Sequence, residues 1–278
     1  MTMRILIVNK FLYLRGGDCV HSLNLKQLLR NAGHDVCFYA MSYSQNIVCE
    51  ENKYFAEEIS FSAKDLQGKI KAASRIIWGI GVVQNFKKLL EEFQPDVVHL
   101  NNIHSYLSPI VAKLAYQRGV KVIWTLHDYK LICPSYSCLC KGNTCEACFT
   151  DKKHVVLRKC MKNSFPASIL AWGEAMNWNK NKLSLWTNSF ICPSQFMAEK
   201  MQQGGYPASK LQVISNFIGE EQVQYIINTP NPIREEAYAY IGRLSQEKGV
   251  ESLLKAASRL PYKLYLSLIH ISEPTRPY

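Results

Sequence analysis

The chain has 278 residues and a formal net charge of +11, and hydrophobic residues make up 47% of it. This composition is too apolar for a disordered protein, and no collagen-like glycine period or internal repeat is present. The longest nearly apolar run, 76–83, is far shorter than the about 20 residues that span a membrane. The N-terminus does not resemble a signal peptide, so we expect a cytoplasmic protein whose ten cysteines need a role other than disulfides.

The first part of the chain predicts one βαβ unit. Residues 5–8 are a continuous aliphatic run, typical of a strand buried on both faces of a parallel sheet. A helix is predicted after Gly16 and Gly17, with Gly33 where its C-cap belongs. Its expected buried stripe consists of Val20, Leu23, Leu28, Leu29 and Ala32. Residues 35–40 form the second predicted strand.

The same alternation continues to residue 214. A helical stretch is predicted between Lys64 and Phe93, and Ser194 is expected to cap a later helix because its hydroxyl can accept a first-turn amide. Further predicted strands are 96–100, 120–126, 190–192 and 211–214. Alternating strands and helices predict an α/β fold with a doubly wound parallel sheet.

A second domain is predicted to follow. We interpret 1–218 as the N-terminal domain and the turn-rich segment 219–236 as a linker. The pattern restarts at 237, so 237–265 is interpreted as the first βαβ unit of another domain, too short to form a core alone. Residues 266–276 resemble a translated sequencing adapter, which predicts a truncated fragment with an artefactual tail at 266–278; a genuine C-terminal tail is the alternative.

Two groups of residues are predicted to contact phosphates. Gly16 and Gly17 lie between a strand and a helix, where free amides and the helix dipole attract phosphate, although a plain tight turn explains them equally well. The G-x-G-x-x-G dinucleotide pattern is absent. Arg243 and Lys248 precede a predicted helix in the second domain and suit a diphosphate better than two unrelated surface charges.

A third candidate site follows the strand that ends near Leu126. His127 is placed to hydrogen-bond a substrate hydroxyl, and Asp128 to help orient it; a solvated loop pair is the alternative. His99 and His104 come from the preceding strand end, so several imidazoles are expected around one crevice, with a spacing that matches no metal motif.

In combination, these motifs resemble the family 4 glycosyltransferases of the GT-B fold, from about Arg4 to Tyr265. The matching segments are Gly16–Gly17, 125–129, 191–194, 213–217 and 240–249. The resemblance implies two Rossmann-like domains, of which the N-terminal one mainly binds the acceptor and the C-terminal one the nucleotide-sugar. It also implies transfer that needs no metal cofactor and retains the anomeric configuration.

The resemblance also assigns roles to residues. Arg243 and Lys248 would hold the donor diphosphate, Gly16 and Gly17 would approach it from the other domain, and His127 would hydrogen-bond the transferred sugar. Two departures matter: a pair of glutamates that the family carries further along is absent, and Asn101 stands where relatives often have His. The first departure predicts that this chain does not transfer sugar.

Six cysteines follow the His-Asp strand end. Cys145 and Cys148 have the spacing of a chelating pair, and Cys133 and Cys160 could complete a tetrahedral structural zinc site. The alternative is a set of reduced, partly buried thiols.

The segment 151–182 is basic and rich in tryptophan. It contains seven bases and two acids: Lys152, Lys153, Arg158, Lys159, Lys162, Lys180, Lys182, Asp151 and Glu174. Such a segment favours contact with an anionic membrane surface, against the alternative of a solvated helix packed on the core. No nucleic-acid motif accompanies the charge.

We therefore predict a glycosyltransferase of polysaccharide or lipid-linked acceptors, peripheral on the inner face of the cell membrane. A non-catalytic zinc-binding module on a Rossmann-like sheet is the main alternative. A nicotinamide oxidoreductase is a second one, disfavoured by the missing dinucleotide pattern and by Arg243 with Lys248.

Overall fold

The computed structural model describes residues 1–61, 65–230, 236–242, 244 and 248–268. The chain divides into two compact units, Met1–Ile218 and Gly219–Tyr278. Among the described residues, no helix is both long enough and apolar enough to cross a bilayer.

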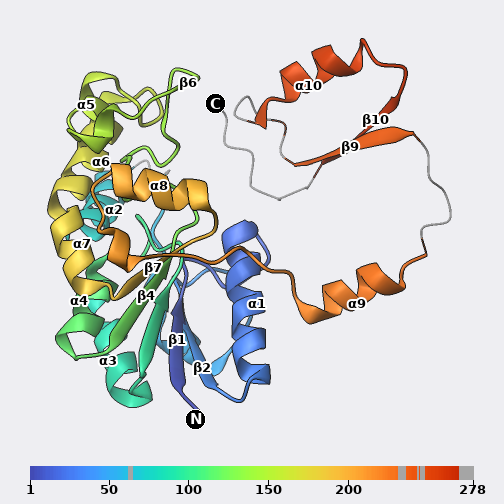
Figure 1. The fold of residues 1–278 in the computed structure, drawn as a ribbon. Coiled ribbons are helices and arrows are strands. Elements are labelled where there is room, and N and C mark those ends of the chain that lie inside the picture. The colour runs from blue at the N-terminus through green and yellow to red at the C-terminus, as the bar shows by residue number, and fades with distance from the viewer. Residues whose placement is uncertain (62–64, 231–235, 243, 245–247, 269–278) are drawn as a thin grey trace. The chain divides into compact units, whose positions relative to one another are not determined.

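The first unit is built on a six-stranded parallel sheet of order β2-β1-β3-β4-β7-β8. Its strands are β1 (Arg4–Val8), β2 (Asp35–Tyr39), β3 (Val97–Leu100), β4 (Lys121–Thr125), β7 (Ser189–Cys192) and β8 (Leu211–Val213). Its α-helices are α1 (Gly17–Asn31), α2 (Leu66–Trp78), α3 (Val83–Phe93), α4 (Ile110–Gln117), α5 (His154–Leu157), α6 (Phe165–Asn177), α7 (Lys180–Trp186) and α8 (Gln195–Gln203). Helix α1 lies along one side of the sheet, and α3, α4 and α7 lie along the other (Figure 1). The predicted α/β fold with a doubly wound parallel sheet is confirmed.

The core follows from the continuous apolar runs of the central strands. Leu6, Ile7 and Val8 of β1 are fully buried, and Trp124 of β4 is 1% exposed. The indole Nε1 of Trp124 donates to the backbone oxygen of Asn101 at 3.0 Å, so the one polar atom of this large side chain is satisfied. The packed sheet thereby fixes where the loops after its strands begin.

Two predicted helices differ from the observed ones. The buried face of α1 consists of Cys19, Ser22 and Leu25, whereas Leu28, which was expected to be buried, is 51% exposed. The predicted stretch 64–93 is two helices, α2 and α3. Gly79 and Gly81 separate them with φ values of 71° and 82°, a left-handed conformation that glycine adopts without strain.

Other local predictions hold. The hydroxyl of Ser194 accepts the backbone N–H of Met197 at 3.2 Å and caps α8, as expected. Gly33 follows α1 with φ 82°, the conformation expected after a helix C-cap.

The sheet has one topological switch point, between β1 and β3. The chain passes from β1 to β2 on one side and then continues with β3 and β4 on the other. The loops after β1 and β3 are tied together, because Lys10 N donates to the Asn102 oxygen at 3.0 Å and Asn102 N donates to Asn9 Oδ1 at 3.0 Å. Ligands of open α/β sheets bind at such a point, outside the carboxyl ends of the strands.

The second unit contains a parallel β9–β10 pair joined by a helix, a βαβ unit. Its elements are α9 (Glu220–Asn228), β9 (Ala237–Gly242), α10 (Val250–Ala257) and β10 (Lys263–Leu268). Helix α9 occupies much of the segment 219–236, which we had interpreted as a linker. Of the predicted artefactual tail, 266–268 belongs to β10, and 269–278 lies outside the described residues.

Candidate functional site

The carboxyl ends of β1, β3 and β4 bring several polar side chains together. His127 follows β4, and its Nε2 lies 3.0 Å from Oδ1 of Asn101, which follows β3. Both residues line a cavity of about 10 Å³, together with Asn102, His104, Trp124, Thr125, Leu126 and Asp128. The sheet thus holds an imidazole and an amide side by side at its switch point. We call this region, with Gly16, Gly17 and His21, the strand-end site.

His127 is neutral at physiological pH. Burial lowers its pKa to about 4, and the neighbouring His21 adds to the effect. Because an amide oxygen only accepts, the Nε2–H of His127 donates to Asn101 and leaves Nδ1 as an acceptor. The ring of His127 lies 5.1 Å from that of His21, which in turn lies 5.4 Å from the Phe217 ring. A hydroxyl that reaches Nδ1 can therefore donate a hydrogen bond.

Asp128 acts on its own loop. Its Oδ1 accepts the backbone N–H of Lys130 at 2.8 Å, and burial raises its pKa. The hydrogen bond that orients the His127 ring is the one it donates to Asn101. From the sequence, Asp128 was expected to have this role. Asp128 thus shapes the turn that carries His127.

The other two predicted imidazoles are held inside the protein. His99 Nε2 lies 2.8 Å from Thr125 Oγ1, and burial lowers the pKa of His99 to about 3. His104 stacks on Trp124 with a centroid distance of 5.4 Å, and burial lowers its pKa well below the usual value. Both rings are neutral, and His104 also lines the cavity beside Asn101 and His127.

Gly16 and Gly17 lie at the start of α1, and the backbone itself does not require glycine at either position. Gly16 has extended angles, φ −156° and ψ 177°, that any residue adopts. A Cβ added to Gly17 would meet nothing within 4 Å, and one added to Gly16 would only touch Asp18 Oδ1 at 3.4 Å. The space in front of these glycines is open, at a helix end that attracts anions.

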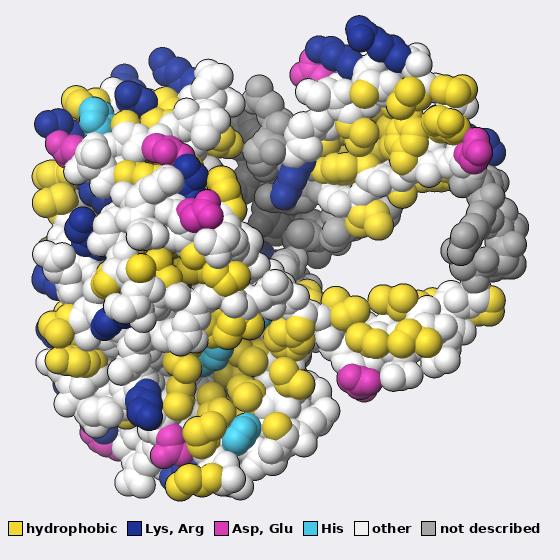
Figure 2. All heavy atoms as spheres, in the orientation of Figure 1, with side chains coloured by type: hydrophobic (Ala, Val, Ile, Leu, Met, Phe, Trp, Pro, Cys, Tyr) yellow, Lys and Arg dark blue, Asp and Glu magenta, His cyan; other side chains and the backbone are white. Residues whose placement is uncertain are grey.

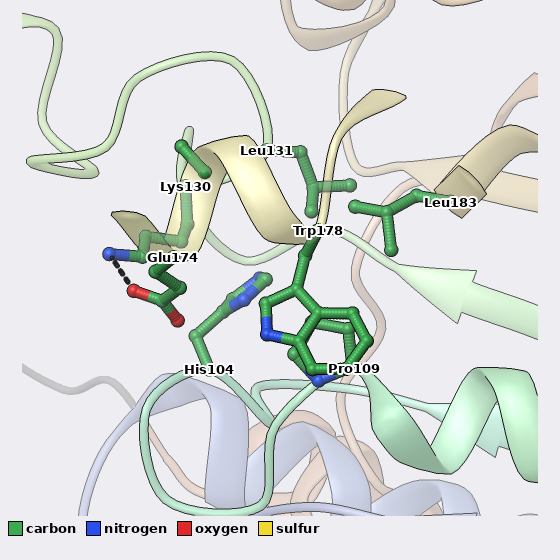
Figure 3. A pocket seen from close by; sticks show the side chains of 8 residues that line it. His104, Pro109, Lys130, Leu131, Glu174, Trp178 and Leu183 are labelled. Atoms are coloured by element: carbon green, nitrogen blue, oxygen red, sulfur yellow. Dashed lines mark ion pairs between the residues drawn. The ribbon is translucent and has the colours of Figure 1, made fainter. Parts of the chain in front are cut away.

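A buried ion pair supports the loop after His127. Lys130 Nζ lies 2.8 Å from Glu174 Oε2 of α6, and their side chains are only 7% and 5% exposed. Figure 3 shows this pair beside His104 and Trp178, around a cavity of about 20 Å³. Lys130 Nζ also donates to the Pro134 oxygen at 2.8 Å. The pair anchors the strand-end loop to α6.

Sequence reasoning missed three residues of this region. Asn9 and Lys10 directly follow β1, so they could have been predicted from the rule that ligands bind at the carboxyl ends of strands. His21 lies one helical turn beyond Gly17. Lys10 Nζ lies 3.4 Å from Asp18 Oδ2. Asn101 Nδ2 and His21 Nδ1 are buried and have no hydrogen-bond partner among the described residues.

The six clustered cysteines form two groups. In the first group, hydrogen bonds with Cys138 and Cys148 lower the pKa of Cys133. In the second group, the side chains of Cys160 and Cys140 are hydrogen-bonded, and Arg158 donates to Cys145 Sγ at 3.0 Å. In the part of the chain that the structure describes, no three Cys, His, Asp or Glu side chains are arranged to hold a metal ion. The members of the predicted zinc site, Cys133, Cys145, Cys148 and Cys160, have different hydrogen-bond partners here, and the zinc site stays a prediction.

The donor-side residues belong to the second unit. Lys248 is exposed and lies just before α10, where Gly249 adopts φ 67°. Arg243 lies outside the described residues.

Similar solved structures share the fold. The Anabaena protein HepE in complex with UDP has a TM-score of 0.54 and 14% identity; the match covers 96% of this chain and 62% of HepE. HepE in complex with UDP-glucose has a TM-score of 0.53 and 14% identity, covering 96% and 60%. The six-stranded parallel sheet and the similarity to these structures show an α/β fold of the GT-B type.

Curated relatives cover less of the chain. An uncharacterised 42.6 kDa protein in the cps region of Klebsiella pneumoniae is 24% identical over 203 residues, 70% of this chain and 47% of that protein. An uncharacterised glycosyltransferase of Methanosarcina acetivorans is 36% identical over 107 residues, 35% of this chain and 28% of that protein. The chain spans about half the length of the first of these and less of the second. The model of Glycosyltransferase Family 4 matches residues 15–222, and the chain therefore belongs to this family.

Proposed function

We propose that the protein transfers a hexosyl unit from a nucleotide-sugar to a saccharide or lipid-linked acceptor, and that the strand-end site receives the sugar. The observation that carries the proposal is a pair of buried polar atoms, Asn101 Nδ2 and His21 Nδ1, that have no hydrogen-bond partner in the described part of the chain. A Cβ added to Gly17, one helical turn before His21, would also meet open space. Buried polar groups are normally hydrogen-bonded, so unpaired ones at a switch point favour a polar ligand. A sugar offers hydroxyls to both.

The chemistry of the site suits this reaction. The neutral His127 offers Nδ1 to a sugar hydroxyl, and the free amides at the start of α1 offer hydrogen bonds to a diphosphate. The leaving diphosphate gains negative charge as the glycosidic bond breaks, so positive potential there lowers the barrier. From the family resemblance we propose that Arg243 and Lys248 add two cations, and that transfer needs no metal and retains the anomeric configuration.

The comparisons support a nucleotide-sugar donor. HepE, whose fold is similar, is described with UDP-glucose. Because this chain spans little more than half of HepE, the proposal concerns the activity of the protein as a whole. The identity of the sugar is left to a panel of donors.

The test is calorimetric titration of the chain with UDP- and GDP-sugars. We expect one sugar of the panel to bind, and the substitution His127→Ala to weaken its binding by about tenfold to a hundredfold, the range for losing a strong hydrogen bond. His34→Ala is the matched control, since His34 directly precedes β2 at the opposite edge of the sheet. Equal binding by both variants, or no binding of any sugar, would contradict the proposal.

A further inference from the structure

Helix α6 turns its apolar residues toward solvent. Phe165, Ile169, Trp172 and Met176 are 51%, 43%, 38% and 52% exposed. Their spacing of three and four residues places them on one helix face. The buried face carries Ser168, Ala171 and Glu174 instead. This arrangement is the reverse of a helix that packs its apolar stripe on the core.

Helix α2 is a neighbour of α6 and also carries exposed apolar side chains. It packs against α6, and a Cβ added to Gly173 of α6 would lie 3.3 Å from Ile77 Cδ1 of α2. Asn177 Nδ2 donates to the Ile77 oxygen at 2.5 Å, and Trp178 Nε1 donates to the Ile76 oxygen at 2.8 Å. Leu66 and Ile70 of α2 are 72% and 58% exposed. We call Leu66, Ile70, Phe165, Ile169, Trp172 and Met176 the α2–α6 face.

Basic side chains accompany this face. The exposed bases of 151–182 are Lys153, Arg158, Lys159, Lys162, Lys180 and Lys182. Of the two acids of the segment, Glu174 is buried with Lys130, and Asp151 lies 2.8 Å from Lys153 and offsets that one charge. The segment therefore keeps an excess of positive charge. Figure 2 shows dark blue and yellow side chains interleaved over the region of α5 to α7, at the left of the view.

We infer that the α2–α6 face docks on an anionic phospholipid bilayer. Exposed aromatic and aliphatic side chains can enter the interface between headgroups and acyl chains, while neighbouring lysines attract the anionic headgroups. The charge complementarity selects a bilayer over a purely apolar protein partner. The inference stands on this face alone and goes beyond the proposed transfer reaction.

Vesicle sedimentation of the full chain tests the inference. Vesicles contain phosphatidylcholine alone or with about a third phosphatidylglycerol, at low and high salt. We expect binding to the anionic vesicles only, weakened by salt. The double substitution Lys159→Gln with Lys162→Gln should lower the partition coefficient by about 25-fold, from the usual contribution of each basic residue. Lys87→Gln with Lys121→Gln, two exposed lysines elsewhere, should leave it nearly unchanged.

The apolar contribution is tested separately. Ile169→Ser with Trp172→Ser should lower the partition coefficient by at least about tenfold. Ile47→Ser with Val48→Ser removes two apolar residues outside the face that are more exposed, at 51% and 88%, and is the control. Circular dichroism confirms that each variant is folded.

Three outcomes would overturn the inference. They are no binding to anionic vesicles at low salt, equal binding to neutral vesicles, and equal loss in the face and control variants. Light scattering adds a fourth: a dimer that Ile169→Ser with Trp172→Ser dissociates would show that a second copy, not a bilayer, covers the face.

Discussion

The strand-end site and the α2–α6 face depart from the burial rule in opposite directions. At the site, polar atoms of Asn101 and His21 are buried without partners among the described residues. On the face, Trp172 and Met176 are exposed on a helix whose inner side carries Ser168 and Glu174. Buried polar groups cost free energy unless they are paired, and exposed apolar patches mark contact surfaces.

The contrast separates two kinds of recognition. We propose a small, hydrogen-bonding ligand for the site, because its donors and acceptors are fixed by neighbouring strands. For the face we propose an extended, weakly structured surface, because its apolar residues are spread along helices. Glu174 links the two regions: it lies on the inner side of α6 and pairs with Lys130, two residues beyond Asp128.

The largest expected effect is on stability at acid pH. Burial holds the folded pKa of His127 at about 4 and that of His99 at about 3, against 6.5 for an ordinary imidazole. Below pH 6.5 the unfolded chain therefore binds protons that the folded chain does not, and stability falls as pH falls. The loss approaches about 1.4 kcal/mol per pH unit for each ring, which integrates to roughly 3 kcal/mol for both between pH 6.5 and 5.

Urea unfolding at a series of pH values measures this slope. Asp128, whose pKa is raised by burial, acts in the opposite sense and reduces the slope at the acid end. His99→Gln should remove about one ring's share of the slope. A slope that is flat from pH 7 to 5 in the unmodified chain would contradict the buried placement of these rings.

The second largest effect concerns the Lys130–Glu174 ion pair, which links the two regions. Glu174→Gln leaves Lys130 buried without its ionic partner, and we expect a loss of roughly 3 kcal/mol in the free energy of unfolding. Glu57→Gln is the control, because Glu57 pairs with Lys71 at the exposed surface and its removal should change stability little. Similar values for the two variants would show that the Lys130–Glu174 pair does not anchor the loop.

The smallest effect concerns the glycines of α1. Gly17→Ala should raise stability by roughly 0.5 kcal/mol, because the added methyl meets open space and the unfolded chain loses freedom. The same substitution should weaken nucleotide-sugar binding, because the methyl enters the space of the ligand. Gly33→Ala, at the other end of the helix, should instead lower stability by roughly 1 kcal/mol, since φ is 82° there.

Thermal unfolding measures the stability of the two variants, and calorimetry measures their nucleotide-sugar binding. Unchanged nucleotide-sugar binding by Gly17→Ala would remove Gly17 from the proposed site.

Much of the fold could be predicted from the sequence, because strands buried on both faces are continuous apolar runs such as 5–8. The face of a helix was harder to predict. The spacing of Phe165, Ile169, Trp172 and Met176 shows that they share a face, but not that it points outward. The inner side of the helix includes Glu174, whose ion-pair partner Lys130 is distant in the sequence.

The site could be predicted only in part, because some of its contacts join residues that are distant in the sequence. His127 and the glycines could be placed from strand ends and turns, and Asn101 was noted as a departure from the family pattern. The contact of Asn101 with His127 and the position of His21 became visible only in the folded structure. For the cysteines, spacing in the sequence did not determine the contacts. Ligand-like spacing at Cys145 and Cys148 did not predict which thiols meet, because the hairpin around Cys140 and the turn near Cys160 decide the grouping.

The most direct test of the account is an NMR titration of the chain with UDP-glucose and the other sugars of the panel. The account predicts that the bound sugar shifts the imidazole signals of His21 and His127 and the amide signals of Gly16 and Gly17, all with one dissociation constant. Binding that shifts other signals while these four stay unchanged would contradict a sugar site at the carboxyl ends of β1, β3 and β4.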